Sequence, residues 1–303
     1  MSERLRRGLN LTLAASQRAK RALLGERLQL RRFPRLLALY ERLVTGVRNQ
    51  VLSGVHGEFT LHLDPQDALR LSLYGGVYEP AETRFASSCL RPGDCVLDLG
   101  AHIGYFSLLF AQRVGPTGSV YAYEPSPTNY ALLTRNVEVN AVRTIHCQPL
   151  AAAEQSGELG FYLDAHERSD NRSYAPPGAG AASLRVQAVR LDEHLPSLGV
   201  EQVDFVKLDL QGAELSALRG LRQTLARSPR ATLLVEFWPR GQVEAGESPE
   251  ALLDLGAELG FEVCELSEEG VALPLERASL LERCTPANGA HVNLVWRRPG
   301  SGA

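Results

Sequence analysis

The sequence lacks any run of about 18 apolar residues, so we expect no transmembrane helix. Its basic N-terminus is followed by only a short, interrupted apolar stretch, which is not typical of a signal peptide. The five cysteines are scattered, and no pair has the spacing of metal ligands. We therefore expect no disulfide framework, no metal site, and a reducing, cytoplasmic location.

Charge is also nearly balanced, with a formal net charge of −3, which gives no overall argument for a nucleic-acid partner. The distribution is uneven, however: residues 1–50 carry +9 and the remainder −12. Apolar residues at three- and four-residue spacing predict one or two helices in residues 1–50. Two interpretations stay open. The segment is either an amphipathic helix that contacts an anionic membrane surface or a partner, or a solvated extension packed on a main domain over residues 51–303.

The dinucleotide fingerprint Gly-x-Gly-x-x-Gly is missing as well. Residues 96–111 read VLDLGAHIGYFSLLFA, which predicts a buried strand over 95–99, a turn containing Gly100 and Gly104, and a helix over 105–114. Strand, glycine turn and helix N-terminus bring backbone N–H groups close to a nucleotide-like ligand. The Asp-x-Gly-x-x-x-Gly spacing points away from NAD and toward S-adenosylmethionine.

A second strand, predicted over 119–123, ends in Glu124, which lies 26 residues beyond Asp98. A carboxylate at that strand tip is placed to hold a ribose diol by two hydrogen bonds. The loop over 149–152, after a third strand, is where we expect the adenine ring.

Further strands are predicted over 203–210 and 232–237, and they alternate with helices. Period two places Lys207 and Asp209 on one strand face. Buried strand runs separated by helices favour a mostly parallel sheet covered on both faces. We expect Lys207 to form an ion pair with Glu214 or Glu236, with a catalytic lysine as the alternative.

Two other features allow two interpretations each. Glu79 precedes a predicted helix, so it either reaches the amino group of the ligand or caps that helix. Residues 164–182 are polar and rich in glycine, proline and alanine. They form either a lid over the substrate or a disordered excursion.

Several motifs together resemble the FkbM family of S-adenosylmethionine-dependent methyltransferases. They are VLDLGAHIGYFS, YAYEP around Glu124, KLDLQGAE from Lys207 and VEFWP from residue 235, with Tyr-Glu-Pro at 78–80 and Arg-Leu-Asp at 190–192. The resemblance covers about residues 56–297. Two positions depart from it: His102 stands where the family commonly has asparagine, and Gln211 where it commonly has glutamate.

The resemblance implies an α/β, Rossmann-like class I methyltransferase fold, with a mostly parallel seven-stranded sheet and helices on both faces. It implies methylation of a hydroxyl on a sugar, glycan or secondary metabolite, with S-adenosylmethionine as cofactor. The partner is then a small-molecule or glycan acceptor, and no nucleic acid is expected. The sequence does not determine the oligomeric state.

The expected site residues lie at the carboxyl edge of the sheet. The expected cofactor contacts are Glu79, Asp98, Gly100, Ala101, His102, Gly104, Glu124, Pro125, Ala151 and Asp209. A hydroxyl needs a proton acceptor to become a good nucleophile. Asp209 is the first candidate, His102 the second (or a cofactor contact instead), and Glu214 the third.

Three competing interpretations remain. The first is a nicotinamide-dependent oxidoreductase, which the missing glycine fingerprint disfavours. The second is a non-catalytic module that retains the fold, which the intact Asp98, Glu124 and Asp209 disfavour. The third is nucleic-acid methylation, which is disfavoured because the Asn/Asp-Pro-Pro-aromatic motif is missing and the main domain is acidic.

Overall fold

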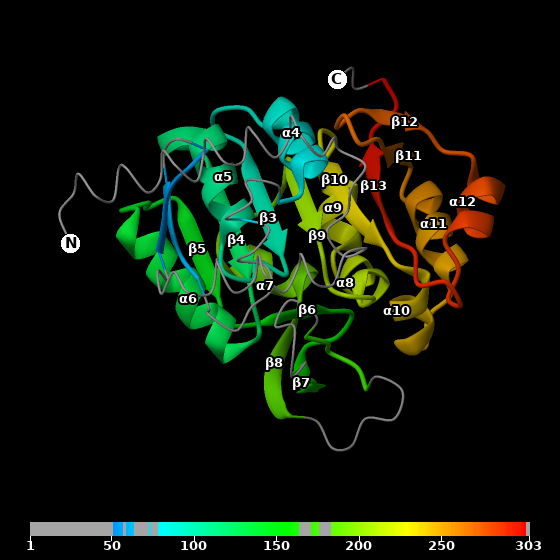
Figure 1. The fold of residues 1–303 in the computed structure, drawn as a ribbon, viewed down its shortest axis with the longest axis horizontal. Coiled ribbons are helices and arrows are strands. Elements are labelled where there is room, and N and C mark those ends of the chain that lie inside the picture. The colour runs from blue at the N-terminus through cyan, green and yellow to red at the C-terminus, as the bar shows by residue number, and fades with distance from the viewer. Residues whose placement is uncertain are drawn as a thin grey trace, which may run out of the picture. The chain divides into compact units, whose positions relative to one another are not determined.

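The computed structural model describes residues 51–56, 59–63, 73, 78–163, 171–175 and 183–300. The chain divides into two compact units, Met1–Gln50 with Leu69–Tyr78, and Val51–Ala68 with Glu79–Ala303. The expected basic extension over residues 1–50 lies outside the described residues, so its helices and its boundary stay predictions. The second unit is an α/β domain built on one large sheet (Figure 1).

The large sheet has eight strands where seven were expected. In spatial order they are β12 (Ala272–Pro274), β11 (Glu262–Leu266), β13 (Val292–Arg297), β10 (Thr232–Phe237), β9 (Phe205–Leu208), β3 (Cys95–Leu99), β4 (Ser119–Tyr123) and β5 (Ile145–Gln148). Neighbours from β10 to β5 pair in parallel, and the other pairs are antiparallel. The additional strand, β12, has three residues and pairs with β11 at the sheet edge.

The strand order reverses at β3. From β3 the chain moves outward through β4 to β5, and it later returns to the other side of β3 with β9 and then β10. In open α/β sheets, ligands bind outside the carboxyl ends of the strands at such a reversal. The turn after β3 begins at that point.

Helices cover both faces of the sheet, as expected. On one face, Phe205 of β9 contacts Phe85 of α4 (Pro80–Cys89) and Phe110 of α5 (Tyr105–Val114), with ring centroids 6.4 and 5.5 Å apart. On the other face, leucine side chains of four helices complete the main core: α7 (Leu191–Ser197), α8 (Glu214–Gly220), α9 (Arg222–Arg227) and α11 (Pro249–Glu258). Both faces of the central strands are buried, which explains their nearly continuous apolar sequences.

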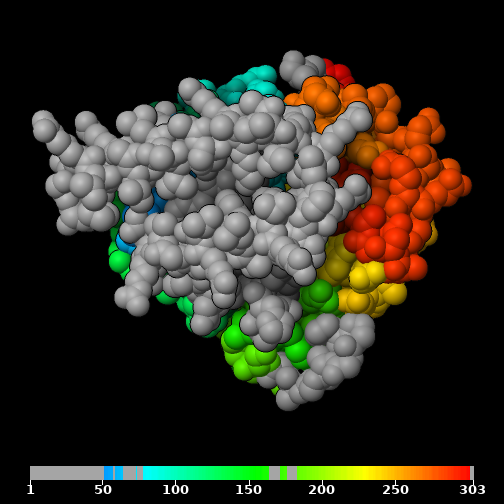
Figure 2. Space-filling model, in the orientation of Figure 1, coloured from blue at the N-terminus to red at the C-terminus, as the bar shows by residue number. Residues whose placement is uncertain are grey.

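Helix α6 (Pro127–Val139) packs against β5 and against the hairpin of β1 (Val51–Val55) and β2 (Phe59–His62). Its N-cap is Ser126, whose hydroxyl accepts the Asn129 N–H. The remaining helices are η2 (Gly115–Thr117), α10 (Pro239–Glu244) and α12 (Arg277–Arg283). In space-filling view, the orange and red C-terminal segment forms one side of the described surface (Figure 2). No helix in the described ranges is long and apolar enough to cross a membrane.

A second sheet contains β6 (Ala151–Ala153), β8 (Leu184–Arg190) and β7 (Gly157–Phe161). Strands β7 and β8 pair antiparallel. The expectation of a loop over 149–152 was wrong in part, because Ala151 begins a buried strand that pairs in parallel with β8. The three alanines of β6 pack against α8. A Cβ at Gly220 of α8 would lie 2.1 Å from the Ala153 carbonyl oxygen, so this position needs glycine.

Candidate cofactor and acceptor site

The turn after β3 closes against the loop after β9. Gly100 has φ +86°, and a Cβ there would lie 2.0 Å from the Asp209 carbonyl oxygen. The N–H groups of Gly100 and Ala101 both donate to the Tyr123 carbonyl of β4, each at 3.0 Å. Gly104, at φ +88°, is the N-cap of α5, and a Cβ there would lie 2.7 Å from Leu133. The glycines at these two positions therefore allow both a left-handed backbone and a close approach.

Glu124 at the end of β4 ties its own turn to the turn after β3. One carboxylate oxygen accepts the His102 N–H at 2.9 Å, and the other accepts the Ser126 N–H at 2.8 Å. Burial raises the pKa of the Glu124 carboxyl to about 7, although both N–H groups and the His102 charge act to lower it. Each carboxylate oxygen has a second acceptor site, so the buried group can still receive ribose hydroxyls. This geometry fits the expected role of Glu124.

Asp98, near the end of β3, is buried and accepts the Ser107 hydroxyl of α5 at 2.5 Å through Oδ2. Its Oδ1 has no hydrogen-bond partner among the described residues. A buried carboxylate oxygen is costly to leave without a donor. The unpaired oxygen and the tight glycine turn both fit an adenosyl ligand with hydroxyl and amino donors.

Three residues around this edge have left-handed backbones without being glycine: Glu79 (φ 38°), His102 (φ 50°) and Gln211 (φ 54°). Such conformations cost about 1 to 3 kcal/mol each and persist only where the surroundings impose them. Glu79 occupies the N-cap position of α4, but its side chain makes no cap hydrogen bond. The interpretation of Glu79 as a residue whose side chain caps this helix was therefore wrong. The three strained residues come from three different loops.

Lys207 of β9 is buried and forms its ion pairs with residues other than those expected. Its Nζ lies 2.9 Å from Asp209 Oδ2 and 4.0 Å from Glu79 Oε2, and it lies 4.6 Å from the centroid of the Phe106 ring. The expected pairing with Glu214 or Glu236 was wrong. Lys207 instead pairs with Asp209, which lies on the same strand face, and with Glu79, which precedes α4. Burial lowers the pKa of Lys207, but Asp209, Glu79 and Asp98 outweigh that effect and raise it above its usual value.

Both oxygens of Asp209 are occupied by donors. Oδ2 receives Lys207, and Oδ1 accepts the Gln211 amide at 2.9 Å. Burial alone raises the pKa of the Asp209 carboxyl, yet Lys207 and Gln211 outweigh burial and hold it below its usual value. A carboxylate stabilised in this way is a weak proton acceptor. The geometry therefore argues against Asp209 as the base and favours a role in positioning.

Glu214 lies fully buried at the start of α8. Its Oε1 accepts the N–H groups of Leu210 and Gly212, at 2.8 and 3.2 Å. Burial raises the pKa of its carboxyl to about 7. Since the side chain is covered and faces its own turn, the catalytic role expected for Glu214 does not fit; it shapes the loop that carries Gln211.

The other expected site residues vary in position. His102 is half-buried, and its positive form lies near enough to lower the pKa of both Glu124 and Asp209. Pro125 follows Glu124 directly and is partly exposed, whereas Ala151 is buried in β6 of the second sheet. Within the described residues, no group of three or more His, Cys, Asp or Glu side chains is arranged to hold a metal ion. All five cysteines are free thiols.

The expected site missed a cluster on the β9 and β10 side. The Gln211 amide also donates to Glu236 Oε2 at 3.3 Å. The Tyr174 hydroxyl donates to the Gln211 carbonyl at 2.6 Å. Glu236 was expected at the carboxyl edge as a partner of Lys207, because it lies one residue before the end of a predicted strand, but its contact with Gln211 was not expected.

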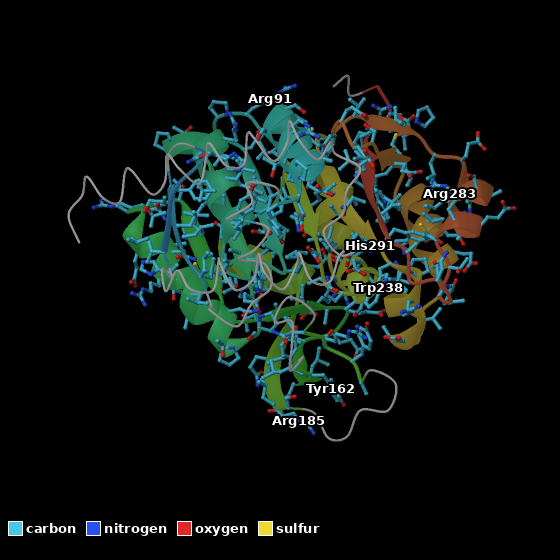
Figure 3. The ribbon with its side chains drawn as sticks, in the orientation of Figure 1. Arg91, Tyr162, Arg185, Trp238, Arg283 and His291 are labelled. Carbon is cyan, nitrogen blue, oxygen red and sulfur yellow. The ribbon has the colours of Figure 1, made fainter. Side chains whose placement is uncertain are left out.

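Arg172, two residues before Tyr174, contacts the segment that follows β10. It forms an ion pair with Glu244 at 2.6 Å and lies 4.8 Å from the centroid of the Trp238 ring. Trp238 is labelled at the end of β10 in Figure 3. Of the segment interpreted as a lid or an excursion, residues 164–170 and 176–182 lie outside the described residues. Residues 171–175 are described and contact Gln211, Trp238 and Glu244.

Comparison with known proteins gives several relatives that are named as methyltransferases. Methyltransferase sdnD of Sordaria araneosa is 28% identical over 185 residues, covering 50% of this chain and 70% of its own. The 31-O-demethyl-FK506 methyltransferase FkbM of Streptomyces tacrolimicus is 29% identical over 163 residues, which cover 44% of this chain and 61% of that protein. The hexuronic acid methyltransferase AglP of Haloferax volcanii is 24% identical over 178 residues, covering 58% and 67%.

The methyltransferase FkbM domain itself matches residues 98–263, more than half of the chain. That range begins at Asp98, passes through Glu124 and the loop from Asp209 to Glu214, and ends in β11. It thus contains the glycine turn, the buried carboxylate that supports it and the polar cluster beside it. This chain belongs to the FkbM family of methyltransferases.

Proposed function

We propose that the protein transfers a methyl group from S-adenosylmethionine to a hydroxyl oxygen of a sugar, glycan or secondary metabolite. The observation that carries the cofactor assignment is the turn after β3, closed by Glu124 through the His102 N–H. The hydroxyl class is supported by relatives whose names specify an oxygen or a hexuronic acid as the target. S-adenosylmethionine supplies an electrophilic methyl group on a sulfonium centre.

The residues of the chain do three things in this reaction. Glu124 and the turn at Gly100 bind and orient the adenosyl group. Asp209, held by Lys207, positions the Gln211 side chain beside this turn. Alignment of donor and acceptor supplies most of the acceleration, because the reaction needs an in-line approach of two held atoms.

The test has two parts. Calorimetric titration of S-adenosylmethionine and, separately, of NADH into the full chain distinguishes a methyltransferase from an oxidoreductase. A panel of uronic acids, neutral sugars, glycans and aliphatic alcohols with radiolabelled methyl donor then identifies the acceptor class, and amines serve as the contrasting class. Binding without transfer to any acceptor is the result expected for a non-catalytic module, and it overturns the proposal.

Residues 1–50 keep both of their interpretations, namely a segment that contacts an anionic membrane surface or a partner, and a solvated extension packed on the main domain. Their charge of +9 is the support for the first of them. Sedimentation with vesicles containing phosphatidylserine, for the full chain and for a variant with six of these arginines changed to glutamine, tests the membrane interpretation. Equal sedimentation of the two proteins contradicts it. The cytoplasmic location also stays a prediction.

A further inference from the structure

The Gln211 side chain joins two carboxylates that arrive from neighbouring strands. Its Nε2 donates to Asp209 Oδ1 at 2.9 Å and to Glu236 Oε2 at 3.3 Å. Gln211 itself is held in place. The Tyr174 hydroxyl donates to its carbonyl, and the Glu214 carboxylate accepts the N–H groups of the residues before and after it. Its backbone is left-handed, at φ 54°. The amide therefore holds the Glu236 carboxylate in one orientation.

Asp209 and Glu236 are equivalent in position but not in what they contact. Both oxygens of Asp209 receive donors, one of them the cation of Lys207. Glu236 receives only the longer contact from Gln211, and its Oε1 has no hydrogen-bond partner among the described residues. Glu236 is also half-buried rather than covered. Of the two, Glu236 has an acceptor site available for a further group.

The position of Glu236 suits the acceptor side of the site. It lies near the carboxyl end of β10, two strands from β3, and neighbouring strands are about 4.8 Å apart, so it stands roughly 10 Å from the turn. Leu234 pairs with Lys207 in the register, and period two places Glu236 on that same face. β10 lies on the opposite side of β3 from β4, whose Glu124 supports the turn after β3, so the carboxylate lies away from the predicted adenosyl site.

We propose that Glu236 is the catalytic base of this enzyme and that Gln211 is the positioning residue that holds its carboxylate. The assignment rests on the proposed function. As the acceptor oxygen forms its bond to the methyl carbon, the bond from that carbon to sulfur breaks with its electron pair remaining on sulfur. The hydroxyl proton passes to Glu236 Oε1, and the products are a methyl ether, S-adenosylhomocysteine and a protonated carboxyl.

The surroundings give Glu236 the higher proton affinity of the two acids. Burial and then the charges of Asp209 and Glu214 raise the pKa of its carboxyl well above the usual value, and Lys207 opposes them. The charged groups that face Glu236 come from four elements: Asp209 after β9, Glu214 of α8, Lys207 of β9 and Glu79 before α4. Across the register in β13 lies the neutral Asn293, whose amide donates to Glu82 of α4. A base works best when its pKa lies near the working pH.

The amide at position 211 is also one of the two departures from the family pattern. A glutamate there would add a third carboxylate beside Asp209 and Glu236 and would remove the donor that both now share. We therefore expect Gln211→Glu to raise the pKa of Glu236 further, whereas Gln211→Ala frees its carboxylate without adding charge.

The experiment compares the full-length wild type with Glu236→Gln, Glu236→Asp, Gln211→Glu and the surface control Glu201→Gln. Thermal melting and calorimetric titration of S-adenosylmethionine establish that each variant folds and binds. Methyl transfer is then measured from pH 5.5 to 9.5 on the best acceptor of the panel above. We expect Glu236→Gln to lose about 10²-fold or more in kcat with cofactor affinity unchanged within threefold. Glu236→Asp should keep part of the activity.

The pH profile tests both residues. Wild-type kcat/KM should rise with pH as Glu236 loses its proton, and this limb should vanish in Glu236→Gln. In Gln211→Glu the limb should move to higher pH, a change that a merely structural role does not produce. Glu236→Gln with more than one-tenth of wild-type kcat, or an unmoved limb in Gln211→Glu, overturns the assignment of that residue.

Carbon-13 NMR of glutamate carboxyls separates this proposal from the proposed function, because it needs no acceptor. The signal lost in Glu236→Gln should titrate well above 4.5 in the wild type and higher still in Gln211→Glu. Titration at the ordinary value overturns the Glu236 assignment even in an active enzyme. If no acceptor in the panel is methylated, the proposed function fails and the catalytic assignment fails with it, whereas a further rise of the Glu236 pKa in Gln211→Glu then still shows that the two side chains are in contact.

Discussion

Glu124 accepts the His102 backbone N–H at 2.9 Å, so the acid that ends one strand holds the first turn after its neighbour. Its other oxygen holds the start of α6 through Ser126. One buried carboxylate thus fixes both segments that border the predicted adenosyl site, namely the turn after β3 and the start of α6. The residue predicted to bind ribose is also the residue that shapes the site for it.

Removing the negative charge of Glu124 should weaken cofactor binding with little change elsewhere. A hydrogen bond to a charged group contributes about 1.5 to 3 kcal/mol, so Glu124→Gln should raise the Kd of S-adenosylmethionine about 10- to 100-fold. Calorimetric titration measures this, and Glu138→Gln, an exposed acid on α6, is the control. Equal affinity in both variants removes Glu124 from the binding site.

A Cβ at Gly100 should destabilise the protein far more than one at Gly199. Both glycines have positive φ, but Gly199 has nothing within 4 Å, whereas a Cβ at Gly100 meets the Asp209 carbonyl. Gly199→Ala should cost about 1 to 2 kcal/mol for its backbone conformation alone. Gly100→Ala should cost about 1 to 3 kcal/mol more, because loops after two strands must separate. Urea unfolding measures both, and equal losses contradict the close approach.

Lys207→Met should strongly destabilise the fold, because it leaves Asp209 and Glu79 without their buried cation. Loss of one partner of a buried pair costs about 3 to 5 kcal/mol. The double variant Lys207→Met with Asp209→Asn should recover part of that loss. Arg222→Met, which breaks an exposed pair with Glu258, should cost less than about 1 kcal/mol. Additive effects of the first two substitutions, measured by urea unfolding, contradict the coupling.

The ligand-free protein should become less stable as pH rises from 5 to 8. The pKa values of Glu124 and Glu214 are about 7 in the folded protein and near 4.5 when unfolded, so the folded state binds these protons more tightly. Their stabilisation is full below pH 4.5 and is lost as pH rises through 7, by up to about 3 kcal/mol for each carboxyl. Asp209, whose pKa is lowered, is ionised throughout this window and adds no slope.

Glu214→Gln removes one contribution to this slope, to which the raised pKa of Glu236 also adds. The amide oxygen can still accept the Leu210 and Gly212 N–H groups, so the turn is retained while the titration is removed. The free energy of unfolding, measured in urea at four values between pH 5 and 8, should fall less steeply in the variant than in the wild type. Parallel curves contradict the raised pKa of Glu214.

Local sequence patterns were enough to predict the central strands of the sheet and the helices between them. The strands at Cys95–Leu99, Ser119–Tyr123 and Thr232–Phe237 and the helix Tyr105–Val114 have the predicted bounds. Periodicity, glycine turns and an Ser-Pro cap are local signals, and local backbone preferences decide them. The carboxyl-edge acids followed from the same signals, since a strand end in the sequence is a strand end in the sheet.

Only the tertiary structure decided which of those acids is paired, which is covered and which is available. Lys207 could pair with several carboxylates, and it contacts Asp209 of its own chain segment and Glu79, which is more than 100 residues away in the sequence. Glu214 is covered, whereas Glu236 is half-buried and contacted by Gln211. These distinctions depend on the desolvation of each group and on charges from segments far apart in the chain, and neither quantity is written in a local pattern of residues.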